Sequence, residues 1–110
     1  MSDSFAVTPN VITEVALKQR LQSGSVLAIR CSRLPTRTAS TWHGIWTMEV
    51  HHPDGNAQML VTARSRLAGE IAVRQFKTAT GIVSFLVDCG FSKVTFPVTE
   101  GGIVKIGLND

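Results

Sequence analysis

Residues 58–98 read QMLVTARSRLAGEIAVRQFKTATGIVSFLVDCGFSKVTFPV, and this stretch decides the fold. Met59, Val61 and Ala63 alternate with their neighbours up to Arg64, which predicts a strand over residues 59–64. Residues 70–77 are rich in strand-forming side chains, and the glycine before them interrupts a continuous helix. These local signals predict the order strand, turn, strand, helix, strand.

The segment 65–77 also permits a helix, because Leu67, Ala68, Ile71 and Ala72 have helical spacing. We favour a turn followed by a strand over residues 70–77. If that strand pairs with residues 59–64 as a hairpin, four cations come together at the ends of the two strands. These cations are Arg64, Arg66, Arg74 and Lys77.

A short helix follows, and Thr78 or Thr80 is its expected N-cap. Gly90 supplies a left-handed stop, after which Phe91 can fold back on Leu86 as in a Schellman ending. The apolar side chains expected on the buried side of this helix are Ile82, Val83, Phe85, Leu86 and Cys89.

Two more strands are predicted on the N-terminal side. Residues 42–51 alternate, which places Trp42 and Trp46 on one face as expected core residues. An Asp-Gly turn then leads back into residues 59–64, so these two strands should pair antiparallel. Residues 26–33 predict a strand that ends at Leu34 and Pro35, and the hydroxyl-rich residues 36–41 predict an exposed loop.

The two ends of the chain complete the pattern. A helix is predicted over residues 9–22, capped by Thr8, and residues 1–7 are expected to form a flexible tail. At the other end, residues 94–98 and 103–108 predict a hairpin around the TEGG turn. Residues 8–110 then form a single α+β domain, in which two helices pack on a mostly antiparallel sheet of about four strands plus the C-terminal hairpin.

Composition excludes several classes of protein. Of the 110 residues, 44% are hydrophobic and 17% charged, which is too apolar for a disordered chain. No apolar run approaches the ~20 residues of a membrane span, and the N-terminus lacks the pattern of a secretory signal. We therefore expect a cytoplasmic protein without a membrane partner. Cys31 and Cys89 are expected to be buried thiols rather than a disulfide.

Neither a catalytic nor a cofactor motif is recognisable. His43, His51 and His52 do not combine with either cysteine at the spacing of a zinc site, and two of them beside a turn are expected to be solvated. The sequence has no phosphate-binding glycine loop and no nucleophile elbow. We therefore expect no enzyme activity, no metal and no cofactor.

The charge distribution points to an acidic partner. The net charge is +3, and the segment from Lys18 to Lys77 contains nine basic residues but only three acidic ones. A basic surface that merely keeps a small protein in solution is the alternative explanation. The candidate nucleic-acid-binding residues are Arg30, Arg33, Arg37, Arg64, Arg66, Arg74, Phe76 and Lys77.

Two details of this candidate site have two interpretations each. Phe76, beside Arg74, is the best candidate for stacking on a base, although a core position is the alternative. Lys77 precedes a helix N-terminus that could bind an anion, or Thr78 merely caps that helix. Replacing Arg64, Arg66 and Arg74 with alanine should flatten the salt dependence of DNA binding.

The pattern also resembles small accessory proteins from the replication and partition regions of bacterial plasmids. In these, a strand ending in Ala-Arg precedes a strand ending in Arg-x-Phe-Lys-Thr, a short helix and a glycine exit. The matching residues are Ala63, Arg64, Arg74, Phe76, Lys77, Thr78, Leu86, Gly90 and Phe91. The resemblance implies a DNA accessory protein.

Topology supplies an analogy and a second hypothesis. Four antiparallel strands before a helix are similar in order to single-stranded-DNA-binding transcriptional cofactors, which are dimers, so we expect a homodimer. The alternative function is a protein-interaction module whose basic surface docks an acidic partner in a replication or partition complex.

Overall fold

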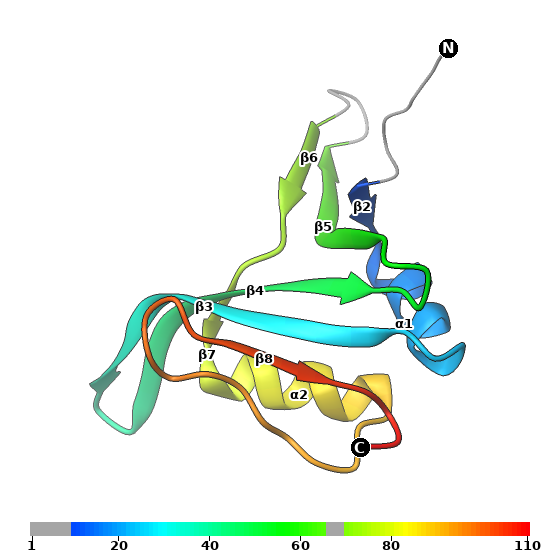
Figure 1. Cartoon of the computed structure of the whole chain (residues 1–110). Helices are drawn as coiled ribbons and strands as arrows, with labels where there is room; N and C mark the ends of the chain where they lie inside the picture. Colours follow the sequence, from blue (N-terminus) through cyan, green and yellow to red (C-terminus); the bar gives the residue numbers. More distant parts are fainter. Residues whose placement is uncertain (1–9, 66–69) are drawn as a thin grey trace.

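The computed structural model describes residues 10–65 and 70–110. In this part of the chain an open, mixed sheet of seven strands is accompanied by two helices (Figure 1). The strands are β2 (Val11–Ile12), β3 (Val26–Thr38), β4 (Thr41–His51), β5 (Ala57–Ser65), β6 (Glu70–Val73), β7 (Phe76–Thr78) and β8 (Ile103–Ile106). The helices are α1 (Glu14–Gln22) and α2 (Ala79–Cys89). The predicted α+β class is confirmed, whereas the strands are more numerous than predicted.

The strand order is β2-β5-β4-β3-β8, with β6 paired to β5 and β7 paired to β4. The pairs are antiparallel except for β2 and β5, which run parallel. The predicted hairpin between residues 42–51 and 59–64 is confirmed, since His51 pairs with Ala57 across the turn. The expectation of a mostly antiparallel sheet is thus correct for all but the β2 edge.

The hairpin of β3 and β4 is longer than the sequence indicates. Residues 36–41 were expected to form a loop, but Thr36 pairs with His43 and Thr38 pairs with Thr41. The register shifts between Arg33 and Thr36, and such an irregularity accommodates Pro35, which has no N–H to give to a ladder. The strand therefore continues past its predicted end into an exposed ribbon.

The N-terminal helix begins later than predicted. Thr13, rather than Thr8, caps α1: its hydroxyl accepts a hydrogen bond from the Ala16 N–H at 3.4 Å. Val11 and Ile12 pair with β5 instead, and Ile12 is buried in the core. Pairing to a strand far along the chain overrides the helical pattern here. The predicted cap Thr8, the first helical residue at position 9 and the tail 1–7 lie outside the described residues.

The preference for a strand over residues 70–77 is confirmed in two pieces. β6 pairs with β5, with Val73 opposite Val61, and β7 pairs with β4, with Phe76 opposite Trp46. The break falls at Arg74, where the chain passes from one neighbour to the other (Figure 1).

The second helix has the predicted boundaries. The Thr78 hydroxyl accepts a hydrogen bond from the Gly81 N–H at 3.0 Å, so Thr78 is the N-cap. Gly90 is left-handed, with φ of 101°, and the Phe91 N–H donates to the Leu86 carbonyl at 3.1 Å. The left-handed Gly90 and the bond from Phe91 to Leu86 form the expected Schellman ending at the C-terminus of the helix. At the N-terminus, the capping interpretation of Thr78 is thereby confirmed.

The predicted C-terminal hairpin is wrong. β8 pairs with β3, and the described structure contains no strand over residues 94–98. This segment packs through side chains instead: Phe96 lies edge-on to Trp46, and the Pro97 carbonyl accepts a hydrogen bond from the Trp46 indole at 2.8 Å. β8 pairs with the edge of β3 at four positions. Residues 94–98 are less suited to a strand pair, because Pro97 has no backbone N–H to donate.

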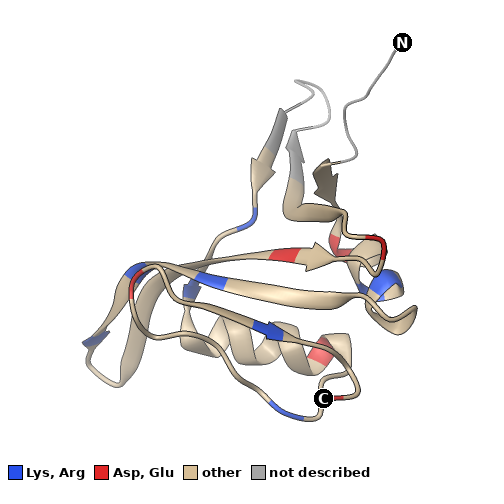
Figure 2. Ribbon diagram, viewed as in Figure 1, with Lys and Arg blue, Asp and Glu red and all other residues tan. Residues whose placement is uncertain are grey.

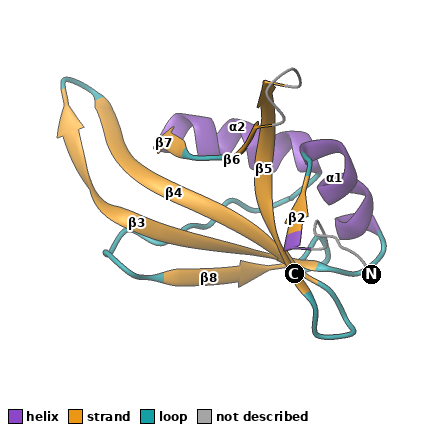
Figure 3. Ribbon diagram, turned by 90° about the horizontal axis from the view of Figure 1, so that it is seen from above, coloured by secondary structure: helices purple, strands orange, loops and turns teal. Residues whose placement is uncertain are grey.

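Both helices lie on the same side of β3 and β4 (Figure 3). The core lies between these helices and the two strands, and it includes the fully buried Leu17, Ile29, Met48 and Leu86. Neither described helix covers the other face of β3, which we call the outer face. Across residues 10–65 and 70–110, no helix is long and apolar enough to cross a membrane.

The prediction of two buried thiols is confirmed. Cys31 and Cys89 are both free and buried in the core. Burial raises the pKa of the Cys89 thiol to about 11 and also raises the pKa of Cys31. Both thiols therefore stay protonated at neutral pH, which makes them weak nucleophiles.

Candidate functional site

The register of β3 divides its three arginines between two faces. Side chains directly opposite in an antiparallel pair lie on the same face. Arg30 is opposite Thr47 and Arg33 is opposite Ile45, so both project from the outer face. Arg37 is opposite Trp42 near the tip of the ribbon, on the other face. The sequence grouped these three cations together without this distinction.

A third cation joins the first two on the outer face. Lys105 on β8 pairs with Ala28, two residues before Arg30, and it is exposed like both arginines. We call Arg30, Arg33 and Lys105 the basic face. Among the described residues, none of these three side chains forms an ion pair. Blue segments in Figure 2 mark basic residues on both β3 and β8. Glu49 lies on the same face, but its carboxylate is 2.9 Å from the His51 ring.

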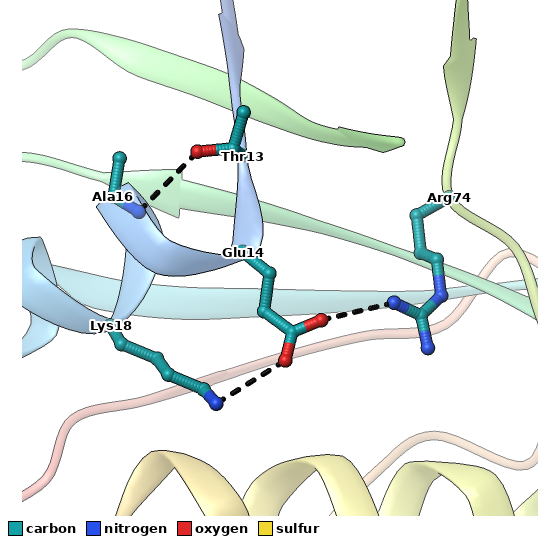
Figure 4. A network of polar contacts seen from close by, with 5 residues as sticks. All are labelled: Thr13, Glu14, Ala16, Lys18 and Arg74. Carbon is teal, nitrogen blue, oxygen red and sulfur yellow. Dashed lines mark hydrogen bonds and ion pairs between the residues drawn. The ribbon is translucent and has the colours of Figure 1, made fainter. Parts of the chain in front are cut away.

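Arg74, by contrast, already has partners. One of its guanidinium nitrogens is 3.3 Å from a carboxylate oxygen of Glu14, whose other oxygen is 3.2 Å from the Lys18 ammonium (Figure 4). The guanidinium also lies over the Phe76 ring, 4.5 Å from its centroid. Arg74 is therefore held by a carboxylate and an aromatic ring, while its contact with phosphate stays a prediction.

Replacing Arg74 with alanine should cost about 1 kcal/mol of folding stability, since it removes a partly exposed ion pair and a cation–π contact. The same change should leave the salt dependence of nucleic-acid binding unchanged. Urea denaturation and a salt titration of binding measure the two effects. A lower salt slope with unchanged stability would contradict this assignment of Arg74.

The other candidate residues near Arg74 also differ from one another in exposure. Phe76 is only 4% exposed and packs against Phe85, with ring centroids 5.0 Å apart, so it belongs to the core and cannot stack on a base. Lys77 is exposed on β7. Arg66 and the side chain of Arg64 lie outside the described residues. The expected four-cation cluster can thus be followed only at Arg74 and Lys77.

An apolar pocket lies beside the exposed ribbon and was not recognised in the sequence. It measures about 420 Å³. Trp42, predicted to be a core residue, is 48% exposed at this pocket, whereas Trp46 is fully buried as predicted. The lining residues are Pro35, Trp42, Trp46, Ala79, Phe96 and Val98. Trp42 is exposed because the tip of the β3–β4 hairpin extends beyond the helices (Figure 3).

Gly44 makes room for the floor of this pocket. A β-carbon at this position would lie 2.9 Å from Cη2 of Trp46 and 3.0 Å from the Arg33 carbonyl oxygen. Only a residue without a side chain lets the Trp46 indole pack over β4. An isolated glycine in an alternating strand signals such a close approach, which is how the sequence could have revealed it.

A hydrogen-bonded relay holds the start of β3, the β4–β5 turn and β2 together. The Gln58 amide nitrogen donates to the Val11 carbonyl at 3.2 Å, so its oxygen accepts from His52 Nε2 at 2.7 Å. His52 Nδ1 is then the acceptor for the Ser25 hydroxyl, also at 2.7 Å. The expectation that His51 and His52 are merely solvated is wrong, since both rings have side-chain partners.

This relay does not form an accessible nucleophile. Ser25 is 3% exposed, and a substrate would have to displace the surrounding chain to reach its hydroxyl. The relay therefore acts on the fold, by tying the parallel β2 edge to the sheet. Within the described part of the chain, no three His, Cys, Asp or Glu side chains gather as a metal site would require.

Comparison of the chain with models of protein families, with curated proteins and with solved structures found no significant match. The function proposed below therefore depends on the residues and their geometry.

Proposed function

We propose that this chain is a non-enzymatic accessory protein that binds DNA through its basic face. The observation that carries the proposal is that Arg30 and Arg33 are exposed on one face of β3 and form no ion pair with any described residue. Arg74, which has partners, is the internal contrast. The resemblance to plasmid accessory proteins supports a role in plasmid replication or partition. The analogy of strand order to dimeric single-stranded-DNA-binding cofactors is the ground for proposing a homodimer.

Arginine suits such a face because its planar guanidinium can donate two hydrogen bonds to one phosphate. Each phosphate contact releases condensed counterions, so binding should weaken steeply as salt rises. Two described acids lie nearby and reduce the positive potential: Glu49, which is paired with His51, and Glu100, in the loop that hydrogen-bonds to Cys31. Phosphates fit this face without any requirement for base sequence.

A second candidate function is docking to an acidic protein partner. The pocket beside Trp42 supports it, because exposed apolar surface next to cations also characterises protein interfaces. Under this alternative the same arginines would contact carboxylates instead of phosphates.

A salt titration of DNA binding tests the first proposal. The double variant Arg30→Ala/Arg33→Ala should lower the slope of log affinity against log salt by about 2, one for each lost phosphate contact. The variant Arg20→Ala/Lys93→Ala is a matched control, since both of these side chains are exposed and neither belongs to β3 or β8, the strands that carry the basic face. This control variant lowers the net charge as much as Arg30→Ala/Arg33→Ala does, but it should retain most of the slope of log affinity against log salt.

Two results would overturn the proposal. One is a failure of both single-stranded and duplex DNA to bind at low salt. The other is an equal loss of slope in the two double variants, since the charge would then act through its total and not through the basic face. Binding of an acidic protein fragment with no binding of DNA would favour the second candidate.

A further inference from the structure

We propose that the pocket beside Trp42 receives one unstacked base of a single strand of nucleic acid. This inference rests on the proposed function and names its ligand class: single strands in preference to duplex. The pocket lies near the tip of the β3–β4 ribbon, where α2 begins and the segment containing Phe96 passes.

The shape and chemistry of the pocket fit a planar, apolar guest. Its volume of about 420 Å³ exceeds the few hundred cubic ångströms at which small-molecule sites begin. Trp42 is half exposed and Val98 is 56% exposed, so both can be covered by a ligand. The buried Trp46 ring forms part of the lining, held edge-on by Phe96. Exposed indole surface is the platform on which bases stack.

One cation lies on the same face as this pocket. Arg37 is opposite Trp42 across the ribbon and therefore on the same face. Exposed Lys77, although only two residues before Ala79, lines a separate hollow with Thr62, Arg74 and Gln75. No acidic side chain is among the residues that line the pocket beside Trp42. A base in the pocket would thus have the Arg37 guanidinium available for a neighbouring phosphate.

A cation next to an apolar pocket favours a nucleotide over an isolated apolar side chain, because every base in a strand is linked to a phosphate. The pocket also excludes the bases of an intact duplex, which are stacked and paired within the helix. A protein partner that inserts an apolar side chain is the competing occupant, and the experiment below distinguishes the two.

The pocket should accept different bases almost equally. The Trp46 indole N–H, the only indole donor of the buried ring, already donates to the Pro97 carbonyl at 2.8 Å. Of the other described lining side chains, only Trp42 has a polar group, its indole N–H, so the pocket offers stacking and at most one hydrogen bond to a base edge. Stacking tolerates any base because every base presents a flat face.

The test compares a thymidine 12-mer with an abasic 12-mer that keeps every phosphate, by fluorescence anisotropy at one fixed salt concentration. The base-bearing strand should bind roughly 5- to 150-fold more tightly, the value of stacking one base. Trp42→Ala should reduce this ratio to near 1, and Trp42→Phe should keep part of it. Val87→Ala, which truncates an equally exposed side chain on α2, is the control and should leave the ratio unchanged.

A second variant tests the same pocket without replacing Trp42, in case Trp42→Ala alters the fold. Val98→Asp places a carboxylate at the mouth of the pocket and should lower the affinity of the thymidine strand more than that of the abasic strand. Thermal unfolding of each variant establishes that it is folded before binding is compared.

The outcomes separate the two proposals. Equal, salt-dependent binding of the two strands, or tighter binding of duplex, overturns this inference and leaves the basic face intact. An absence of binding to all nucleic acids overturns both proposals. Loss of binding to an acidic, tryptophan-containing peptide in Trp42→Ala, with the ratio between the two strands unchanged, also overturns it in favour of a protein occupant.

Discussion

Replacing Trp46 with alanine is expected to lower the free energy of unfolding by about 3–5 kcal/mol. The indole is fully buried, contacts Phe96 edge to face and donates to the Pro97 carbonyl, so truncation opens a cavity and removes a buried hydrogen bond. Domains of this size are stable by only about 5–15 kcal/mol. Urea denaturation followed by circular dichroism measures the loss.

Trp42→Ala is the matched control for this prediction. It removes the same number of atoms from the same strand, but its ring is half exposed and the structure gives its indole no hydrogen bond within the described residues. Its cost should stay near 1 kcal/mol, because much of the area lost was already in contact with water. Similar losses for both tryptophans would show that the assignment of buried and exposed faces on β4 is wrong.

Gly44→Ala is expected to cost about 1–3 kcal/mol, although it adds only a methyl group. The new carbon would lie within 3.0 Å of a rigid buried ring and a backbone carbonyl, so β3 or the Trp46 indole must shift. Because that ring lines the pocket, the preference for base-bearing over abasic strands should fall together with stability.

A double-mutant cycle identifies the cause of this cost. In a Trp46→Phe background the Cη2 atom that the new methyl would meet is gone, so Gly44→Ala should cost less than in the natural chain. The free energy of unfolding of the four proteins gives the coupling. An unchanged cost in both backgrounds would assign the strain to the Arg33 carbonyl alone.

Local signals predicted the elements whose determinants are close together in the chain. The boundaries of α2 follow from Thr78 and Gly90, each of which acts within a few residues of itself. The turn between β4 and β5 follows from Asp54 and Gly55, the latter left-handed with φ of 95°. These interactions need no partner from elsewhere, so the sequence pattern was sufficient.

The candidate site was predicted less well because exposure and pairing depend on distant segments. Arg74 and Glu14, which form an ion pair, are 60 residues apart, and nothing in either neighbourhood indicates the other. Trp42 and Trp46 share a face of β4, yet only Trp46 is covered by α2 and the Phe96 segment. The same alternation therefore predicted one correctly and one wrongly.

Patterns within the chain are enough to predict the α+β class, the hairpin turn and the capped second helix, and they reveal the excess of cations between Lys18 and Lys77. Folding is needed to establish which strand β8 pairs with, which cations have no described partner and where a pocket opens. The physical reason is that caps and turns are satisfied by neighbours in the chain. Register and burial are set instead by contacts between segments that meet only when the sheet forms.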